Sequence, residues 1–213
     1  MAPAETGTHG SGTAAPTTRA AAKAARREQL LTVAKTLFAR HGFHGVRLED
    51  LAKGAGISAP AVYRHFESKE AVLEELLVGI SQYLHAGGRE VIDVGTGRAA
   101  TAADAAEVLV RLIDFHVDFA MAEPELIRIQ DRDFAALPET SRRTIRRLQR
   151  AYVSDWASVV EDVHPDWGSE SATIRVHAVF GMMNSTPYLA RGLSSGNVSR
   201  ELRTAARAAL GLG

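Results

Sequence analysis

Apolar residues recur every three or four positions along most of the chain, and this spacing predicts α-helices rather than strands. Within residues 26–40 the apolar positions at helical spacing are Leu30, Val33, Ala34, Leu37 and Phe38. Gly42 then favours an end to this helix, because glycine adopts a left-handed cap at little cost. Neither a strand-like alternation nor a long internal repeat is present, so the predicted fold class is all-α.

Short helices follow one another closely in the next part of the chain. Residues 47–53 predict a second helix, which the glycines at 54 and 56 end. Ser58 is a favourable N-cap for a third helix, with Pro60 in the first turn, where its missing N–H is harmless. Ser68 caps a fourth helix. Two short helices joined by a glycine-containing turn are typical of a helix-turn-helix.

The chain divides into four predicted parts. Residues 1–18 are small and polar and are expected to form a flexible tail, because they cannot bury enough surface to offset their ordering entropy. Residues 19–84 form a first domain, with the helix-turn-helix at 47–66. The glycine-rich segment 85–100 is predicted to be a linker. Residues 101–213 form a second domain.

The second domain is also predicted to be helical throughout. The expected helices are 103–122, a short one from Pro124 to about residue 134, 139–163, 170–191 and 199–210. The last two carry small residues in register, which favour close approach of helices. These small residues are Ala178, Gly181, Ser185, Ala205, Ala206 and Ala209.

Composition narrows the class of protein. Apolar residues make up 46% of the 213 positions, enough for a packed core. The chain has no cysteine, which excludes disulfides, thiolate metal sites and cysteine nucleophiles and fits a reducing compartment. It lacks both a run of roughly 18 apolar residues and the apolar centre of a signal peptide. We therefore expect a cytoplasmic protein without a membrane partner.

Positive charge is concentrated near the N-terminus, although the net charge of the whole chain is zero. Residues 19–69 hold ten basic and four acidic residues, and an acidic remainder balances them. Such a basic unit can hold phosphates and leave the rest of the chain for another task, whereas ordinary fluctuation of surface charge is the alternative. Residues 19–27, "RAAAKAARR", can extend the first helix and carry cations towards a phosphate backbone.

The predicted third helix has two different faces. Ile57, Val62 and Phe66 are spaced to point into the core. The opposite face is expected to present Ala59, Pro60, Ala61, Arg64 and His65. Small side chains let a helix lie deep in a DNA groove, and alanine methyls can contact thymine methyls. Arg64 can span a guanine edge with two hydrogen bonds; a solvated arginine is the plain alternative.

The stretch "LFARHGFHGVRLEDLAKGAGISAPAVYRHFESKEAVLEELL" (37–77) resembles the DNA-binding domain of the TetR family of bacterial transcriptional repressors. The matching residues are Phe38, Gly42, Phe43, Leu48, Leu51, Ala52, Ala55, Gly56, Ile57, Ser58, Val62, Tyr63, His65, Phe66, Lys69 and Leu73. The resemblance implies a homodimer, with each third helix in the major groove of half of a palindromic operator. It also implies a C-terminal domain that binds a small effector, releases DNA, and forms a dimer through the last two helices.

The chain departs from the family pattern at two places. The second helix of the family usually begins with Thr or Ser at the position of Arg47, so a phosphate contact from Arg47 is plausible but a hydroxyl contact is not. Ala59 and Ala61 offer no hydrogen bonds to bases. By resemblance Tyr63 holds a phosphate through its hydroxyl, and Lys69 holds another. The residues expected to contact DNA are Arg47, Ser58, Ala59, Pro60, Ala61, Tyr63, Arg64, His65 and Lys69.

Aromatic and flexible apolar residues in the second domain suggest a ligand cavity, with a plain aromatic core as the alternative. The candidate ligand-binding residues are Phe115, Phe119, Phe134, Tyr152, Trp156, His177, Phe180, Met183 and Asn184. Tyr152, His177 and Asn184 are the polar candidates for orienting a ligand. The basic segment 141–150 could instead attract an anionic effector such as an acyl-coenzyme A, or be a solvated helix face.

Other interpretations find less support in the sequence. His41, His44 and His65 could suggest a metal site, but Gly42 interrupts the spacing and no carboxylate stands at ligand spacing. The carboxylates of 123–134 are expected to form surface ion pairs with Arg128 and Arg132. We expect neither a cofactor nor an enzyme, because no nucleophile–base pair or metal set is present. An all-α enzyme that uses the C-terminal pocket, a DNA-binding protein without an effector, and an activator in place of a repressor remain alternatives.

Overall fold

The computed structural model describes residues 18–96, 101–189 and 192–212, and within these ranges the regular secondary structure is entirely helical. This confirms the predicted all-α class. The helices are α1 (Thr18–His41), α2 (Leu48–Gly54), α3 (Ala59–Tyr63), α4 (Lys69–Thr96), α5 (Ala102–Ala122), α6 (Pro124–Asp133), α7 (Glu139–Val163), α8 (Gly168–Met183) and α9 (Ser195–Ala209), with 3-10 turns at Phe134–Ala136 and Thr186–Tyr188.

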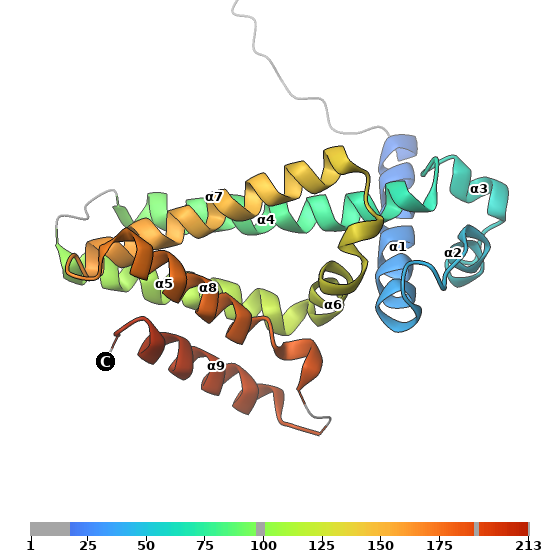
Figure 1. Ribbon diagram of the computed structural model, residues 1–213. Coiled ribbons are helices and arrows are strands. Elements are labelled where there is room, and N and C mark those ends of the chain that lie inside the picture. Colours follow the sequence, from blue (N-terminus) through green and yellow to red (C-terminus); the bar gives the residue numbers. More distant parts are fainter. Residues whose placement is uncertain (1–17, 97–100, 190–191, 213) are drawn as a thin grey trace, which may run out of the picture.

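The first three helices and the start of α4 form a small head at one end of the molecule (Figure 1). Glycines in the left-handed region, Gly42 at φ 79° and Gly56 at φ 64°, allow the chain to reverse after α1 and after α2. The head closes around Leu30, Phe38 and Leu51, which are fully buried. Burial of these apolar side chains holds the short helices α2 and α3, since helices of this length are not stable alone.

The head shares its core with the second domain. The buried cluster around Phe38 also contains Leu126 and Ile129 of α6, Leu137, and Ile145 of α7. The two parts of the chain are therefore packed against each other rather than joined only by a connection.

The prediction of a linker at 85–100 does not fit the structure over residues 85–96, which continue α4 as one 28-residue helix. Residues 97–100 lie outside the described residues, as do the predicted tail residues 1–17. The misleading signal was the glycine content of this stretch. Gly87 and Gly88 are tolerated inside the helix because side chains of neighbouring helices occupy the space of their missing Cβ atoms: Phe115 at Gly87 and Tyr152 at Gly88.

The long helices α4, α5 and α7 form the centre of the second domain, and α8 and α9 cover one side of it (Figure 1). Its core surrounds Leu109, Leu112, Ile113 and Trp156, all fully buried. The predicted bounds of α6 and α7 agree with the structure to within a residue. The predicted helix 170–191 instead ends at Met183, and α9 begins earlier, at Ser195. In the described part of the chain, no helix is long and apolar enough to cross a membrane.

Candidate nucleic-acid interface and interior cavity

The recognition face of α3 consists of fewer residues than the sequence suggested. Ser58, Pro60, Tyr63 and Arg64 are exposed, and Tyr63 has 54% of its surface free. Ser58 occupies the N-cap of α3 in an extended conformation, although its side chain makes no capping hydrogen bond. These exposed groups could reach a base or a phosphate without rearrangement of the head.

Two alanines predicted to face DNA point elsewhere. Ala61 is 8% exposed and belongs to the buried set, and Ala59 is half-buried against the core of the head. The spacing of Ile57, Val62 and Phe66 predicted a single inward-facing row of side chains, but α3, which packs against α2, also buries Ala61. His65 is half-buried and lies at the edge of the exposed face.

Arg47 occupies the N-cap of α2. Its backbone N–H donates to the Asp50 carboxylate at 2.8 Å, which is the half of a capping box that the third residue of the helix supplies, and the Arg47 side chain makes no capping hydrogen bond. The Arg47 residue itself is exposed. A contact of Arg47 with phosphate remains a proposal.

Lys69 is already engaged inside the head. Its Nζ donates to the backbone oxygens of Phe43 and Val46, each at 2.8 Å, and lies 4.2 Å from the centre of the Phe43 ring. These carbonyls belong to the loop between α1 and α2, so Lys69 fixes that loop against the first turn of α4. Two of the three N–H donors of Lys69 thus stabilise the head. The predicted phosphate contact would have to be made by the one that remains.

Cations of α1 surround the end of α3. Arg27 donates to the backbone oxygen of His65, forms an ion pair with Glu75 and lies 4.0 Å from the centre of the Phe66 ring. Burial lowers the pKa of His65, and the neighbouring Lys23 and Arg27 lower it further. His65 is therefore harder to protonate than a free histidine, and its buried Nδ1 has no hydrogen-bond partner among the described residues.

An aromatic cluster in the second domain centres on His116, which is 2% exposed. The His116 ring stacks on Phe180 at 4.7 Å between centroids and also contacts Phe119, Tyr152 and Trp156 at 5.8–6.0 Å. His116 falls at the helical spacing of the apolar residues of 103–122, but it is not among the ligand-binding residues predicted from the sequence. The sequence signal that could have identified it is a single histidine at the helical spacing of the apolar residues of α5.

His116 joins the two polar candidates Tyr152 and Asn184. Its Nδ1 lies 3.2 Å from the Tyr152 hydroxyl, and its Nε2 lies 3.1 Å from Oδ1 of Asn184. Since an amide oxygen only accepts, Nε2 carries the proton and Nδ1 accepts from Tyr152. Burial lowers the pKa of His116 to about 4, although the Asn184 hydrogen bond opposes this shift, and burial raises the pKa of Tyr152. The network is neutral at pH 7.

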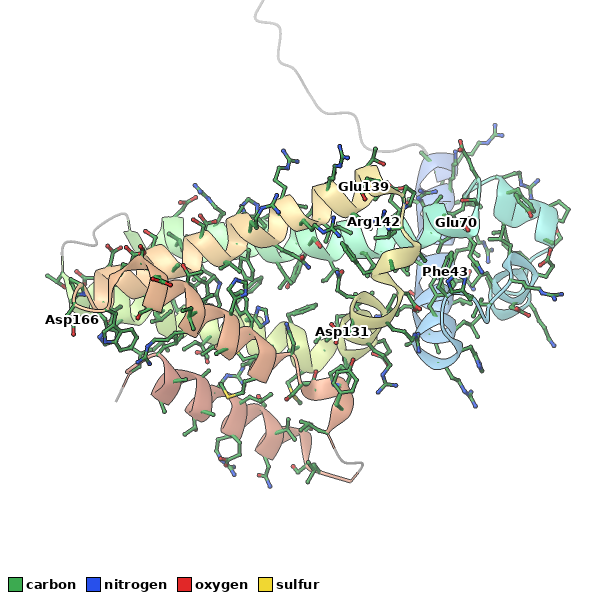
Figure 2. All side chains as sticks on the ribbon, in the orientation of Figure 1. Phe43, Glu70, Asp131, Glu139, Arg142 and Asp166 are labelled. Carbon is green, nitrogen blue, oxygen red and sulfur yellow. The ribbon has the colours of Figure 1, made fainter. Side chains whose placement is uncertain are left out.

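A cavity of about 90 Å³ lies beside this network. Tyr152, Asn184 and Phe119 line it together with groups of α4, α6 and α7. The other lining residues are Ile80, Ser81, Leu84, Leu126, Ile127, Gln130, Asp131, Leu148 and Gln149. Figure 2 places Asp131 on α6, where that helix lies between the head and the rest of the second domain.

Not all predicted ligand residues gather at this cavity. Phe180, Trp156 and Met183 lie in the core behind it. Phe115 instead lies against Tyr83 with the two rings tilted by 34°, and Phe134 packs against the core of the head. His177 is exposed and faces a separate groove between α7 and α8, so the structure does not bring it to the aromatic cluster. Its helical position alone could not distinguish the inner from the outer face of α8.

Helix α6 contacts both the cavity and the head. The guanidinium of Arg132 donates to the backbone oxygens of Phe38 and Ala39 at the end of α1, and it pairs with the buried carboxylate of Asp133 at 3.0 Å. A second ion pair joins Lys35 of α1 to Glu123 just before α6. The ion pair expected of Arg132 is thus made with Asp133 of the same helix, and its hydrogen bonds to Phe38 and Ala39 join α6 to the head.

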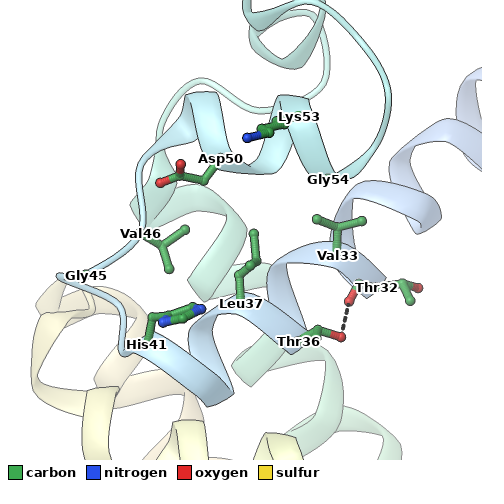
Figure 3. A pocket seen from close by; sticks show the side chains of 10 residues that line it. All are labelled: Thr32, Val33, Thr36, Leu37, His41, Gly45, Val46, Asp50, Lys53 and Gly54. Carbon is green, nitrogen blue, oxygen red and sulfur yellow. Dashed lines mark hydrogen bonds between the residues drawn. The ribbon is translucent and has the colours of Figure 1, made fainter.

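A larger groove, of about 740 Å³, lies in the head between α1 and α2 (Figure 3). Val33, Leu37 and Val46 form its apolar part, and exposed His41, Asp50 and Lys53 surround it. This groove lies on the surface of the head and is separate from the predicted effector cavity. Within the described ranges, no group of three or more His, Asp or Glu side chains is arranged to hold a metal ion.

A helix-turn-helix head packed on a larger helical domain defines the class: a DNA-binding regulator of the helix-turn-helix type. Residues 30–76 match the family described as bacterial regulatory proteins, tetR family, and residues 102–188 match the tetracyclin repressor-like C-terminal domain. The chain is 30% identical over 169 residues to the HTH-type transcriptional repressor KstR2 of Rhodococcus jostii (strain RHA1), covering 79% of each chain. The chain belongs to the TetR family of bacterial transcriptional regulators, as the resemblance predicted.

Solved structures agree with this fold. The ketosteroid transcriptional regulator KstR2 of Mycobacterium tuberculosis matches with a TM-score of 0.71 at 22% identity, covering 87% of this chain and 93% of that one. AibR, solved in complex with isovaleryl coenzyme A and operator DNA, matches with a TM-score of 0.64 at 15% identity, covering 84% and 97%. The family is one of transcriptional regulators rather than of enzymes.

Proposed function

We propose that this protein is a homodimeric, ligand-responsive repressor that a small, largely apolar effector releases from a palindromic operator. The observation that carries the proposal is the position of α6. Four of its residues line the cavity, while Arg132 on the same ten-residue helix is hydrogen-bonded to α1 of the head. A shift of α6 caused by a ligand in the cavity would therefore act directly on α1 of the DNA-binding head.

The small volume of the cavity implies that a lining helix must shift before a ligand can bind. Ligand sites commonly measure roughly 300–1,000 Å³, whereas this cavity holds about 90 Å³. A ligand that needs a site of that size would have to displace part of the lining. Helix α6 is the shortest of the four helices that line the cavity, and its displacement would strain the contacts of Arg132 with Phe38 and Ala39.

The lining favours an uncharged effector. Among the described residues, no Lys or Arg lines the cavity, and Asp131 would repel an anion. Ser81, Gln130, Gln149, Tyr152 and Asn184 offer hydrogen bonds on an otherwise apolar wall. A ketone or hydroxyl on a hydrocarbon frame fits these groups better than a carboxylate does. An acyl-coenzyme A, as in the AibR complex, would have to keep its charged part outside, near the arginines of 141–150.

Recognition of DNA is assigned to the exposed face of α3, with Arg64 as the base-reading residue. The test uses duplexes selected from a randomised library by the purified full-length protein. We expect Arg64→Ala to relax discrimination at one base step by roughly 1–3 kcal/mol, measured by competition among single-base variants. Glu125→Ala, on the exposed surface of α6, is the control and should leave discrimination unchanged. If the wild-type protein shows no sequence preference at any salt concentration, the proposed function is wrong.

The effector is tested on the selected duplex with two probes, a ketosteroid and isovaleryl coenzyme A. We expect the neutral probe to weaken DNA binding and the double variant Tyr152→Phe/Asn184→Leu to reduce this response while retaining affinity for DNA. His177→Ala, outside the cavity, should respond like wild type. If the acyl-coenzyme A alone releases DNA, the effector is anionic and the assigned chemistry is wrong.

A further inference from the structure

Helix α1 extends beyond the body of the head. All residues from Thr18 to Arg26 are exposed, and burial on α1 begins only with Arg27 and Leu30. In this described segment, no side chain has a hydrogen bond or ion pair outside α1; Arg26 bonds Gln29 of the same helix at 2.6 Å. At a rise of about 1.5 Å per residue, the extension projects by roughly 13 Å.

The cations of this extension lie on one face. Arg19, Lys23 and Arg26 are spaced four and three residues apart, so their side chains form one row along the helix. The first acidic residue of α1 is Glu28, which comes after this row. Like charges at this spacing, and cations in the first turns of a helix, disfavour helix formation by a few tenths of a kcal/mol per pair. A polyanion beside the row would reverse this cost.

The row is continuous with the recognition face of α3. Arg27, one residue beyond the row, contacts the His65 backbone oxygen and the Phe66 ring at the end of α3. Its charge is balanced by Glu75. The charges of Lys23, Arg26 and Arg64, all exposed, also act on His65 at the end of α3 and lower its pKa, and Arg19 lies one turn before Lys23 on the same helix. The side from which α3 would enter a major groove is thus bordered by the row on α1.

We propose that the projecting segment Thr18–Arg26 is a second DNA-contacting element, whose row of cations binds the phosphate backbone flanking the half-site read by α3. The occupant is the sugar–phosphate backbone, because the row offers charge at regular spacing but no planar or apolar group that would read a base. This inference rests on the proposed function. It adds an element and three residues outside the helix-turn-helix.

The experiment compares wild type with the triple variant Arg19→Gln/Lys23→Gln/Arg26→Gln on the selected duplex over a series of salt concentrations. All three positions are exposed, so the variant should fold, and helix content and assembly state are matched first. Each lost phosphate contact lowers the slope of log affinity against log salt by roughly 0.9. We expect a slope smaller by roughly 2–3 per half-site, with sequence discrimination retained. The control variant Arg89→Gln/Arg111→Gln/Arg200→Gln removes the same charge from exposed sites of the second domain and should keep the wild-type slope.

A second measurement trims the duplex from its ends in steps of two base pairs. Wild type should lose affinity when the flanking phosphates are removed, whereas the triple variant should show no loss until the half-site itself is cut. If wild type selects a duplex but the triple variant has the same salt slope and length dependence, the inference is overturned and the proposed function stands. If wild type selects no duplex at all, both are overturned.

Discussion

Lys69 and His116 show how single side chains obtain their roles from neighbours that are distant in the sequence. Lys69 was expected at a phosphate, but two carbonyls of the α1–α2 loop occupy two of its N–H donors. His116 lies on the apolar face of α5, and its partners Tyr152 and Asn184 come from α7 and the end of α8. The loop carbonyls and the network partners become neighbours only when the helices pack.

Replacing Lys69 with Met should destabilise the head. The variant keeps much of the aliphatic chain but leaves the Phe43 and Val46 carbonyls without their donor, and hydrogen bonds to charged groups contribute about 1.5–3 kcal/mol each. Because both carbonyls can partly rehydrate, we expect a loss of about 1–3 kcal/mol in unfolding free energy, measured by urea denaturation. Lys53→Met, at an exposed position of α2, is the control. Unchanged stability with weaker binding to every duplex would instead support the phosphate role.

His116 should make stability depend on pH. Its pKa is about 4 in the folded protein against 6.5 when unfolded, so the unfolded state binds more protons between these values. Stability from this group is complete above pH 6.5 and falls as the pH drops towards 4, by about 3 kcal/mol. His116→Gln should remove this part of the slope in denaturation measured from pH 7 to 4. An identical slope in the variant would contradict the assignment.

At the scale of elements, α4 and α6 connect the head to the second domain. The periodicity located both helices, and α6 agrees with its predicted bounds because Pro124 fixes its start. The end of α4 was mispredicted because glycine lowers helix propensity by about 1 kcal/mol relative to alanine. That local cost is outweighed where Phe115 and Tyr152 pack closely against the glycine backbone.

Two glycines of α4 should respond oppositely to the same substitution. An added Cβ at Gly88 would lie 2.4 Å from Cε2 of Tyr152, whereas at Gly79 it would meet no atom within 4 Å. Gly79→Ala should stabilise the protein by roughly 0.5–1 kcal/mol through helix propensity. Gly88→Ala should destabilise it by roughly 1–3 kcal/mol through overpacking. Thermal unfolding of both variants checks this, and equal shifts would mean that Tyr152 does not pack on Gly88.

At the scale of the whole molecule, the predicted dimer would use the uncovered sides of α8 and α9. The small residues Ala178, Gly181 and Ala205 are exposed there, while Ala206 is fully buried within the chain. Exposed Ile174, with 60% of its surface free, extends the same surface of α8. A row of small side chains beside an apolar one allows close approach of a second copy.

Ala178→Arg should weaken this association. An arginine would insert a long charged side chain between closely packed helices, so sedimentation should show a shift from twice the mass of one chain towards a single chain. Operator affinity should fall with it, since the two heads would no longer be linked. Ala86→Arg, on the exposed side of α4, is the matched control. A dimer that tolerates Ala178→Arg would place the interface elsewhere.

The sequence by itself determined the helical class, the helix-turn-helix, most helix bounds and the family, because periodicity, capping residues and glycine turns act over a few neighbouring positions. It also selected Tyr152 and Asn184. Only the tertiary structure decided that Ala61 is buried, that Lys69 holds a loop, that His177 faces away and that His116 links the polar groups of the cavity. Those outcomes depend on which helix covers which side of another, and that is fixed by packing between segments far apart in the chain.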